Sequence, residues 1–153
     1  MSEAAIPAYM EPQWFFPLFA VMWLGISALL SHVGGWSSLA ADFRAEQPAI
    51  GESFRFVSGS VGAKFLPVSY GRCLFVVVNN EGFHLSILFP FRFQTPPLFI
   101  PWIQVETVEE KRFLFVRYTA IRVRNQWPNI SIRGRAGQCI REAYAVTHSK
   151  SAL

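Results

Sequence analysis

The most informative stretch of the chain is the run Trp14-Phe15-Phe16-Pro17-Leu18-Phe19-Ala20-Val21-Met22-Trp23-Leu24-Gly25-Ile26-Ser27-Ala28-Leu29-Leu30-Ser31-His32-Val33. It contains no Asp, Glu, Lys or Arg, and apolar residues occupy every face of the helix that it would form. Such a helix has no side for water, whereas about 20 apolar residues are enough to cross a bilayer. Its Leu, Ile, Phe and Val residues together favour insertion by about 3 to 6 kcal/mol. The stretch therefore predicts a transmembrane helix, with a buried core helix as the alternative.

The charges on either side of residues 14–33 predict the orientation of this helix. Residues 1–13 hold Glu3 and Glu11 but no Lys or Arg, while the basic residues that follow the helix begin with Arg44. Because Lys and Arg favour the cytoplasmic side, we expect a single-pass cell-membrane protein with its N-terminus outside and its C-terminal part in the cytoplasm. A cleaved signal peptide is the competing interpretation, because residues 37–41 imitate a cleavage site, but the acidic N-terminus argues against it.

Composition shifts divide the rest of the chain. Gly34-Gly35 ends the helix, and residues 36–45 have a weak helical pattern that would lie on the membrane surface or on the next domain. The expected organisation is a short extracytoplasmic N-terminus, a transmembrane helix, a juxtamembrane segment, one β-domain and a tail, over residues 1–13, 14–33, 34–49, 50–147 and 148–153.

Residues 50–147 have a pattern typical of strands. Alternating or β-branched runs, separated by turn residues, predict strands within 53–57, 72–78, 83–89, 99–105, 113–123 and 130–132. Turns are expected at 58–62, 79–82, 109–112 and 125–129, and a closing helix at 134–147. The predicted fold is mainly β: about seven antiparallel strands in a small barrel or orthogonal sandwich, capped by a C-terminal helix.

Two short motifs in this region carry a family resemblance. The stretch Ile100-Pro101-Trp102-Ile103-Gln104-Val105 resembles the Ile-Pro-aromatic-x-x-aliphatic signature of a middle strand in pleckstrin-homology-like domains. The stretch Asn79-Asn80-Glu81-Gly82-Phe83-His84-Leu85 is similar to their Asn/Asp-Gly strand opening. The resemblance covers residues 50–147 and extends to GRAM-type and bacterial membrane-anchored members. It implies a binding or scaffolding domain, although the first hairpin carries only Arg55, Lys64 and Arg72, which departs from the phosphoinositide-binding pattern of that family.

The charge of the chain is concentrated at one end. Residues 111–153 hold nine basic residues against Glu142 alone, a net charge of +8, whereas residues 1–110 carry −4. Such a basic region attracts anionic lipid headgroups, acidic proteins or nucleic acid. For a membrane-anchored domain we expect the membrane as partner, with an acidic protein as the alternative, and no nucleic acid. The candidate binding residues are Arg117, Arg122, Arg124, Arg133 and Arg135.

The sequence offers little that predicts catalysis. Cys73 and Cys139 lie far apart without a CxxC motif, and no two His residues have metal-ligand spacing, so we expect no metal and no cofactor. Cys73 and His84 could approach one another across a hairpin as a nucleophile–base pair, which would make the protein a hydrolase. We expect a non-enzymatic binding or adaptor protein instead. A structural subunit of a membrane complex, with contacts made by Phe89, Phe91, Phe93 and Phe99, is a further alternative.

Overall fold

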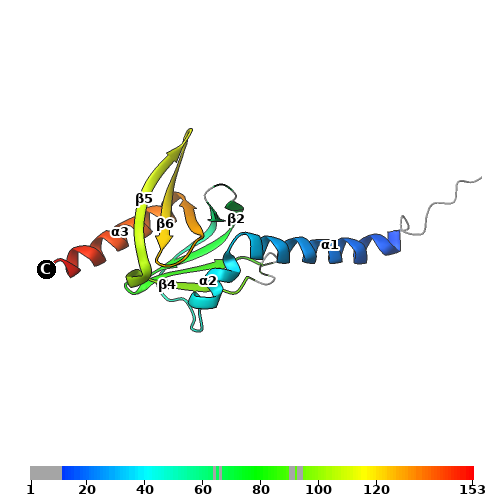
Figure 1. Ribbon diagram of the computed structural model, residues 1–153, viewed down its shortest axis with the longest axis horizontal. Coiled ribbons are helices and arrows are strands. Elements are labelled where there is room, and N and C mark those ends of the chain that lie inside the picture. Colours follow the sequence, from blue (N-terminus) through cyan, green and yellow to red (C-terminus); the bar gives the residue numbers. More distant parts are fainter. Residues whose placement is uncertain (1–11, 64, 66, 90–91, 93–94) are drawn as a thin grey trace, which may run out of the picture.

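The computed structural model describes residues 12–63, 65, 67–89, 92 and 95–153, and it shows a long helix that projects from a curled antiparallel sheet (Figure 1). The predictions that concern residues 1–11, Lys64, Pro90, Phe91 and Phe93 lie outside the described residues. The elements are, in chain order, α1 (Pro12–Val33), α2 (Trp36–Phe43), β1 (Glu52–Gly62), β2 (Pro67–Val78), β3 (Gly82–Ile87), β4 (Leu98–Pro101), η2 (Trp102–Gln104), β5 (Val105–Phe113), β6 (Val116–Val123), β7 (Asn129–Arg133) and α3 (Gly134–Ser151).

Helix α1 stands apart from the rest of the molecule. It is 22 residues long, and Ser31 is the one residue of this helix that is buried. Large apolar side chains along it are open to the surroundings, with Phe16 72% and Val21 68% exposed. These exposures do not fit a core helix of a soluble protein. Among the described residues, one helix is long and apolar enough to cross a membrane, and this helix is α1.

Helix α2 belongs to the core of the β-domain, although the sequence assigns it to the juxtamembrane segment. Trp36 and Leu39 are fully buried. The indole Nε1 of Trp36 donates a hydrogen bond of 3.0 Å to the carbonyl oxygen of Pro96. Of the two sequence-based alternatives for residues 36–45, the structure therefore supports docking on the domain.

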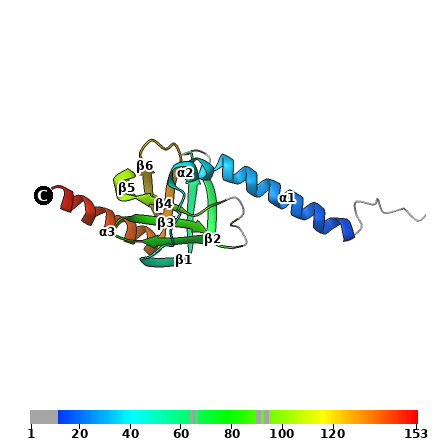
Figure 2. The same ribbon diagram turned by 90° about the horizontal axis from the view of Figure 1, so that it is seen from below.

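The seven strands form one sheet in the order β4-β3-β2-β1-β7-β6-β5, in which every neighbouring pair is antiparallel. The sheet curls into a half-barrel, and α1 and α3 leave it in opposite directions (Figure 2). Register irregularities between Phe54 and Gly59 bend β1, and Phe56 has a φ of 56°. Such bulges increase the local twist and help a sheet to curl. The predicted mainly-β class, with about seven antiparallel strands and a closing helix, is confirmed.

Two predicted turns are wrong. Residues 58–62 continue β1, and residues 109–112 lie inside β5, where Arg112 pairs with Arg117 of β6. The charged residues of β5 suggested a solvated turn, but the outer edge of a sheet is solvated too. The actual turn is the apolar pair Leu114-Phe115, and Leu114 adopts a φ of 55°.

The expected strand at 99–105 is also corrected. Strand β4 ends at Pro101, and the one-turn helix η2 leads from there into β5. Pro101 has no N–H to continue a ladder, so the strand stops at this residue. The indole Nε1 of Trp102 donates to the carbonyl oxygen of Asn79, 3.1 Å away. This bond ties η2 to the β2–β3 turn.

The β2–β3 turn itself is confirmed. The side-chain oxygen of Asn79 accepts hydrogen bonds from the backbone N–H groups of Glu81 and Gly82, each at 3.0 Å. They add to the backbone bond from the N–H of Asn79 to the carbonyl oxygen of Gly82, also 3.0 Å. Asn is favoured in turns because its side chain can bond to the following backbone in this way.

Helix α3 closes the core, as its predicted apolar face requires. Ala136 and Ile140 are buried, while Cys139, Ala143 and Tyr144 pack against the core from its margin. Gly137 allows the close approach: a Cβ there would lie 2.6 Å from the Thr119 hydroxyl oxygen and 2.7 Å from the Ile132 carbonyl oxygen. The helix therefore lies directly on β6 and β7.

Candidate functional site

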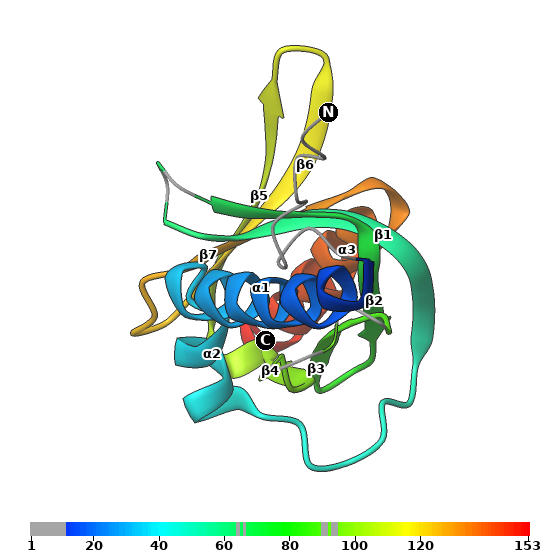
Figure 3. The ribbon, with the colours of Figure 1, turned by 90° about the vertical axis from the view of Figure 1, so that its right-hand side faces the viewer.

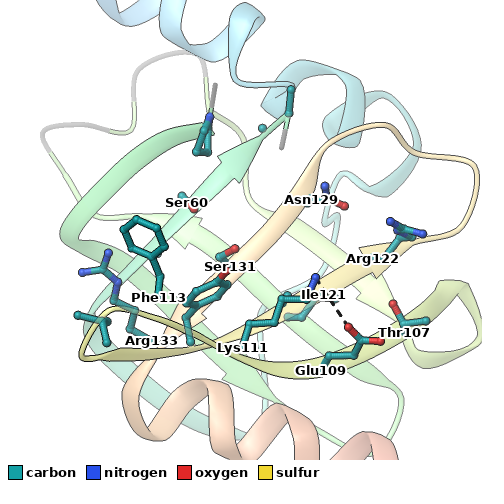
Figure 4. Close-up of a pocket in the computed structure, with 17 residues that line it drawn as sticks. Ser60, Thr107, Glu109, Lys111, Phe113, Ile121, Arg122, Asn129, Ser131 and Arg133 are labelled. Atoms are coloured by element: carbon teal, nitrogen blue, oxygen red, sulfur yellow. Dashed lines mark ion pairs between the residues drawn. The ribbon is translucent and has the colours of Figure 1, made fainter. Parts of the chain in front are cut away.

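A groove of about 430 Å³ lies on strands β1, β5, β6 and β7, on the face that is turned away from α3 (Figure 4). We call it the sheet groove. Polar and charged side chains from all four strands line it, among them Ser60, Lys111, Arg122, Asn129, Ser131 and Arg133.

Strict alternation along the strands creates this polar face. On β6 and β7 the residues that point to the core are buried: Thr119, Ile121, Val123, Ile130 and Ile132. The residues between them point to the opposite side because successive side chains of a strand alternate. Those intervening residues are the groove-lining Tyr118, Ala120, Arg122, Asn129, Ser131 and Arg133.

Small side chains form the floor of the sheet groove. Ser131 is paired with Ser60 on β1 and with Ala120 on β6, so three short side chains lie in one row across the sheet. Beside this row, Gly59 permits tight pairing of β1 and β7, because a Cβ at Gly59 would lie 2.4 Å from the carbonyl oxygen of Ser131. Because these side chains are short, the longer side chains at the two ends, such as Arg122 and Arg133, form the walls of the groove.

The cations lie at the two ends of the sheet groove. One row across the strands contains Arg122, which is paired with Asn129 and with Thr107. A second row, four residues away along β6, contains Tyr118, which is paired with Arg133 and with Lys111. At about 3.3 Å per residue, the two rows are about 13 Å apart. The Nζ of Lys111 forms an ion pair of 3.8 Å with Glu109 (Figure 4). Three cations against one carboxylate give the groove a net positive charge.

The structure brings together two of the five candidate arginines, Arg122 and Arg133. Arg117 faces the α3 side, where its guanidinium lies 3.9 Å from a carboxylate oxygen of Glu110. Arg124 follows the end of β6, and Arg135 lies in the first turn of α3; neither lines the sheet groove.

Sequence reasoning missed Lys111, Ser60 and Ser131 as groove residues. Lys111 and Ser60 were assigned to turns, so their faces on a strand were not considered. Strand β5 runs to Phe113, and alternate residues along it line the groove: Thr107, Glu109 and Lys111. This alternation is the sequence pattern that identifies the groove face of β5.

The proposed Cys–His pair does not come together. His84 is paired with Val77, while the backbone carbonyl oxygen of Cys73 accepts a hydrogen bond from the N–H of Leu88, at the other end of the ladder. Four residues along β2 separate the two positions, or about 13 Å. Burial raises the pKa of the Cys73 thiol and lowers the pKa of the His84 imidazole. Both groups are therefore driven to their neutral forms, which is the opposite of an activated thiolate.

The aromatic residues of the subunit alternative divide between surface and sheet. Phe89 is 89% exposed. Phe99 is half-buried on β4, and its ring lies 4.6 Å from the His84 ring, centroid to centroid. The two others, Phe91 and Phe93, are outside the described residues.

No group of three or more His, Cys, Asp or Glu side chains is arranged to hold a metal ion among the residues that the structure describes. The sheet groove offers charge and hydrogen bonds rather than a nucleophile with its base. No protein-family model and no curated protein matches the chain.

Proposed function

We propose that the protein is a single-pass membrane protein whose cytoplasmic β-domain is a pleckstrin-homology-like binding module. In this proposal the sheet groove holds the headgroups of anionic lipids, and the protein is an adaptor and not an enzyme. The observation that carries the proposal is the collection of Arg122, Arg133 and Lys111 along one polar groove, in a chain that also has a helix suited to span a membrane.

The anchor supports a lipid ligand over a freely diffusing one. Only Gly34 and Gly35 separate α1 from α2, and α2 is part of the β-domain core. A domain held this closely to the bilayer meets headgroups at a high effective concentration, so weak individual contacts are sufficient. The acidic N-terminus and the basic C-terminal part favour placing the β-domain on the cytoplasmic side, where anionic lipids are abundant.

The direction of the sheet groove supports the same ligand. The core and α3 lie on one side of β5, β6 and β7, and the groove lies on the other side. Helices α1 and α3 leave the sheet in opposite directions, and the β5–β6 hairpin projects beyond both β1 and α1 in the view along α1 (Figure 2 and Figure 3). The face turned away from α3, which carries the groove, is therefore turned toward the end of the domain from which α1 extends.

The chemistry of the lining fits a phosphate with a hydroxylated headgroup. Arginine and lysine bind phosphate through charge-assisted hydrogen bonds. The hydroxyl groups of Ser60 and Ser131 and the amide of Asn129 can bond to the neutral part of a headgroup. Each basic residue near a membrane surface contributes about 1 kcal/mol of attraction to anionic lipid.

The strand order and the closing helix are compatible with a pleckstrin-homology-like fold, which supports a binding role by analogy. The cations of the proposed site come from β5, β6 and β7, and not from the first hairpin, where Arg55 and Arg72 lie on β1 and β2. The first hairpin would contribute uncharged residues of β1, such as Ser60, to the bound ligand.

The test is a titration of the full chain, solubilised in a zwitterionic detergent, with short-chain phosphatidylglycerol and with short-chain phosphatidylcholine. Binding is followed by NMR through the side-chain N–H signals of the arginines. We expect binding of phosphatidylglycerol alone, weakened by added salt. Arg122→Gln and Arg133→Gln should each weaken it about fivefold, the equivalent of about 1 kcal/mol. Arg135→Gln is the matched control and should change it less than twofold.

Equal binding of both lipids, or equal losses for all three variants, would contradict a lipid site in the sheet groove. A glutamate-rich peptide that binds with the same dependence on Arg122 and Arg133, in the absence of any response to phosphatidylglycerol, would point to an acidic protein partner instead. A parallel titration with glycerol 3-phosphate distinguishes the binding of a free phosphate ester from the binding of a lipid.

A further inference from the structure

Strand β5 is the last strand of the sheet and has a free outer edge. It pairs with β6 on one side, and no strand pairs with its other side among the described residues. Residues 109–113 are exposed. An edge of this length presents unpaired backbone N–H and C=O groups, which can continue the sheet into another chain.

The β5–β6 turn fixes which backbone groups point outward. Phe113 and Val116 close a two-residue hairpin and form the first hydrogen-bonded pair. Because hydrogen-bonded and non-hydrogen-bonded pairs alternate, Lys111 and Glu109 also direct their backbone groups to β6. Glu110 and Arg112 direct theirs to the free edge.

Charges along this edge follow an order that is complementary to itself. Read from the base of β5, acidic Glu109 and Glu110 are followed by basic Lys111 and Arg112. An antiparallel pairing centred on Glu110 places Glu109 of each copy opposite Lys111 of the other, while Arg112 falls opposite Val108. Opposite charges on facing positions stabilise a strand pair by about 0.2–1 kcal/mol each, whereas like charges destabilise it.

Exposed apolar residues also lie at both ends of the hairpin. At its tip, Leu114 is 74% and Phe115 91% exposed, and at its base Ile103 is 76% exposed. A turn normally carries Asn or Gly, and the positive φ of Leu114 is unfavourable for a branched apolar residue. Apolar side chains in this position therefore require a reason other than turn formation.

We propose that β5 pairs with β5 of a second copy of this chain, antiparallel about a two-fold axis at Glu110. Glu109 of each copy then faces Lys111 of the other. Leu114 and Phe115 of each tip lie beside Glu106 and Val105 of the other copy, next to its exposed Ile103. The two Glu110 carboxylates meet at the axis, but each already has Arg117 and Arg141 of its own chain as ion-pair partners.

The proposed dimer is compatible with a shared membrane. A two-fold axis perpendicular to the sheet keeps the same face of both copies on the same side. The hairpin extends past the rest of the domain with β5 at its margin, and α1 lies toward the viewer (Figure 3). Both copies of α1 thus leave toward one side, as two helices in one bilayer must.

Cysteine cross-linking of the full chain in lipid nanodiscs tests the pairing and its register. In a background of Cys73→Ser and Cys139→Ser, single cysteines are placed at each position from 106 to 114 and oxidised. Two residues at the axis have Cα atoms about 5.5 Å apart, which a disulfide can span. We expect the highest yield for Glu110→Cys, and almost none for Glu106→Cys or Leu114→Cys, which lie about 26 Å from their own copies.

A charge exchange tests the same interface without cysteine. Glu109→Lys and Lys111→Glu should each reduce the dimer fraction at least fivefold, because each brings like charges face to face. A mixture of the two variants should restore dimers that contain one copy of each, as detected with two different fluorophores. A structural role of the Glu109–Lys111 pair within one chain would not be rescued by mixing.

A cross-linking yield that is equal at all positions, or that is highest at 114, would overturn the pairing, and the second pattern would indicate contact through the tips alone. A chain that remains monomeric at every protein-to-lipid ratio would overturn it as well. Neither result affects the lipid site, because its test is carried out on arginines of the sheet groove.

Discussion

Trp36 and Tyr70 meet edge to face, with ring centroids 5.7 Å apart, where the short helix after α1 docks on β2. Trp36 is fully buried, and burial raises the pKa of Tyr70 to about 12. The contact shows that the folded domain begins at α2. The anchor therefore leads directly into the core.

A fragment that begins at residue 34 should consequently fold, whereas one that begins at residue 50 should be much less stable. Loss of Trp36 and Leu39 removes two fully buried side chains, and each such loss costs about 2–5 kcal/mol. Urea unfolding of the two fragments, followed by tryptophan fluorescence and circular dichroism, measures the difference. Equal midpoints would show that α2 does not contribute to the stability of the domain.

Gly137→Ala should destabilise the domain by about 1–3 kcal/mol. The added methyl group would lie 2.7 Å from the carbonyl oxygen of Ile132, a backbone atom that cannot rotate away. This effect should exceed the gain of about 1 kcal/mol that alanine brings to a helix. Thermal unfolding provides the measurement. Gly71→Ala is the control, because a Cβ at Gly71 meets nothing within 4 Å.

Cys139 should react slowly with iodoacetamide. Burial, together with its hydrogen bond to Glu52, raises the pKa of the thiol to about 11. Since the thiolate is the reactive form, alkylation at pH 8 should be about 10- to 100-fold slower than that of the same protein unfolded in urea. Glu52→Gln removes a negative neighbour and should accelerate the reaction. Mass spectrometry of the Cys139 peptide gives the rates, and a rate equal to that of the unfolded chain would contradict the packing of α3.

The same shift predicts how stability depends on pH. A thiol with a raised pKa in the folded state stabilises the fold fully below the ordinary thiol pKa of 9.0. That contribution is lost as the pH rises from about 9 to about 11. Cys139→Ala should flatten this part of the stability curve. Urea midpoints between pH 8 and pH 11 measure it, and parallel curves for the two proteins would show that the thiol does not titrate with folding.

Reversal of the flanking charges should reverse the orientation in the membrane. The acidic pair Glu3 and Glu11 precedes α1, and Arg44 follows it. Changing these to Lys, Lys and Glu places positive charge on the N-terminal side, which then favours the cytoplasm. Protease protection of a C-terminal tag in intact cells reports the side. If the parent tag is already digested from outside, the β-domain is not cytoplasmic.

The sequence was sufficient for the class of the fold because each strand of the core repeats a simple alternation. The charged stretch Glu109-Glu110-Lys111-Arg112 misled the prediction, since composition alone does not distinguish a turn from an edge strand. Leu114-Phe115 was overlooked as a turn for the converse reason, because apolar residues seldom form one.

Which of the candidate arginines share one face could not be predicted, for a similar physical reason. The positive charge of residues 111–153 is visible in the sequence, but its division between faces depends on register. Arg117 and Arg122 lie on one strand, yet the odd spacing between them sends them to opposite sides of the sheet. No count of charges could have separated them.

The two glycines after α1 leave little freedom between anchor and domain. A Cβ at Gly34 would lie 2.7 Å from the side chain of Val68, and one at Gly35 would lie 2.8 Å from Trp127 and Pro128. A change in the direction of α1 at this junction must therefore displace Val68, Trp127 or Pro128, which belong to the β-domain. In the proposed membrane-anchored arrangement, spanning helices tilt to match the hydrocarbon thickness, so a thicker or thinner bilayer would turn the groove toward or away from the lipid surface.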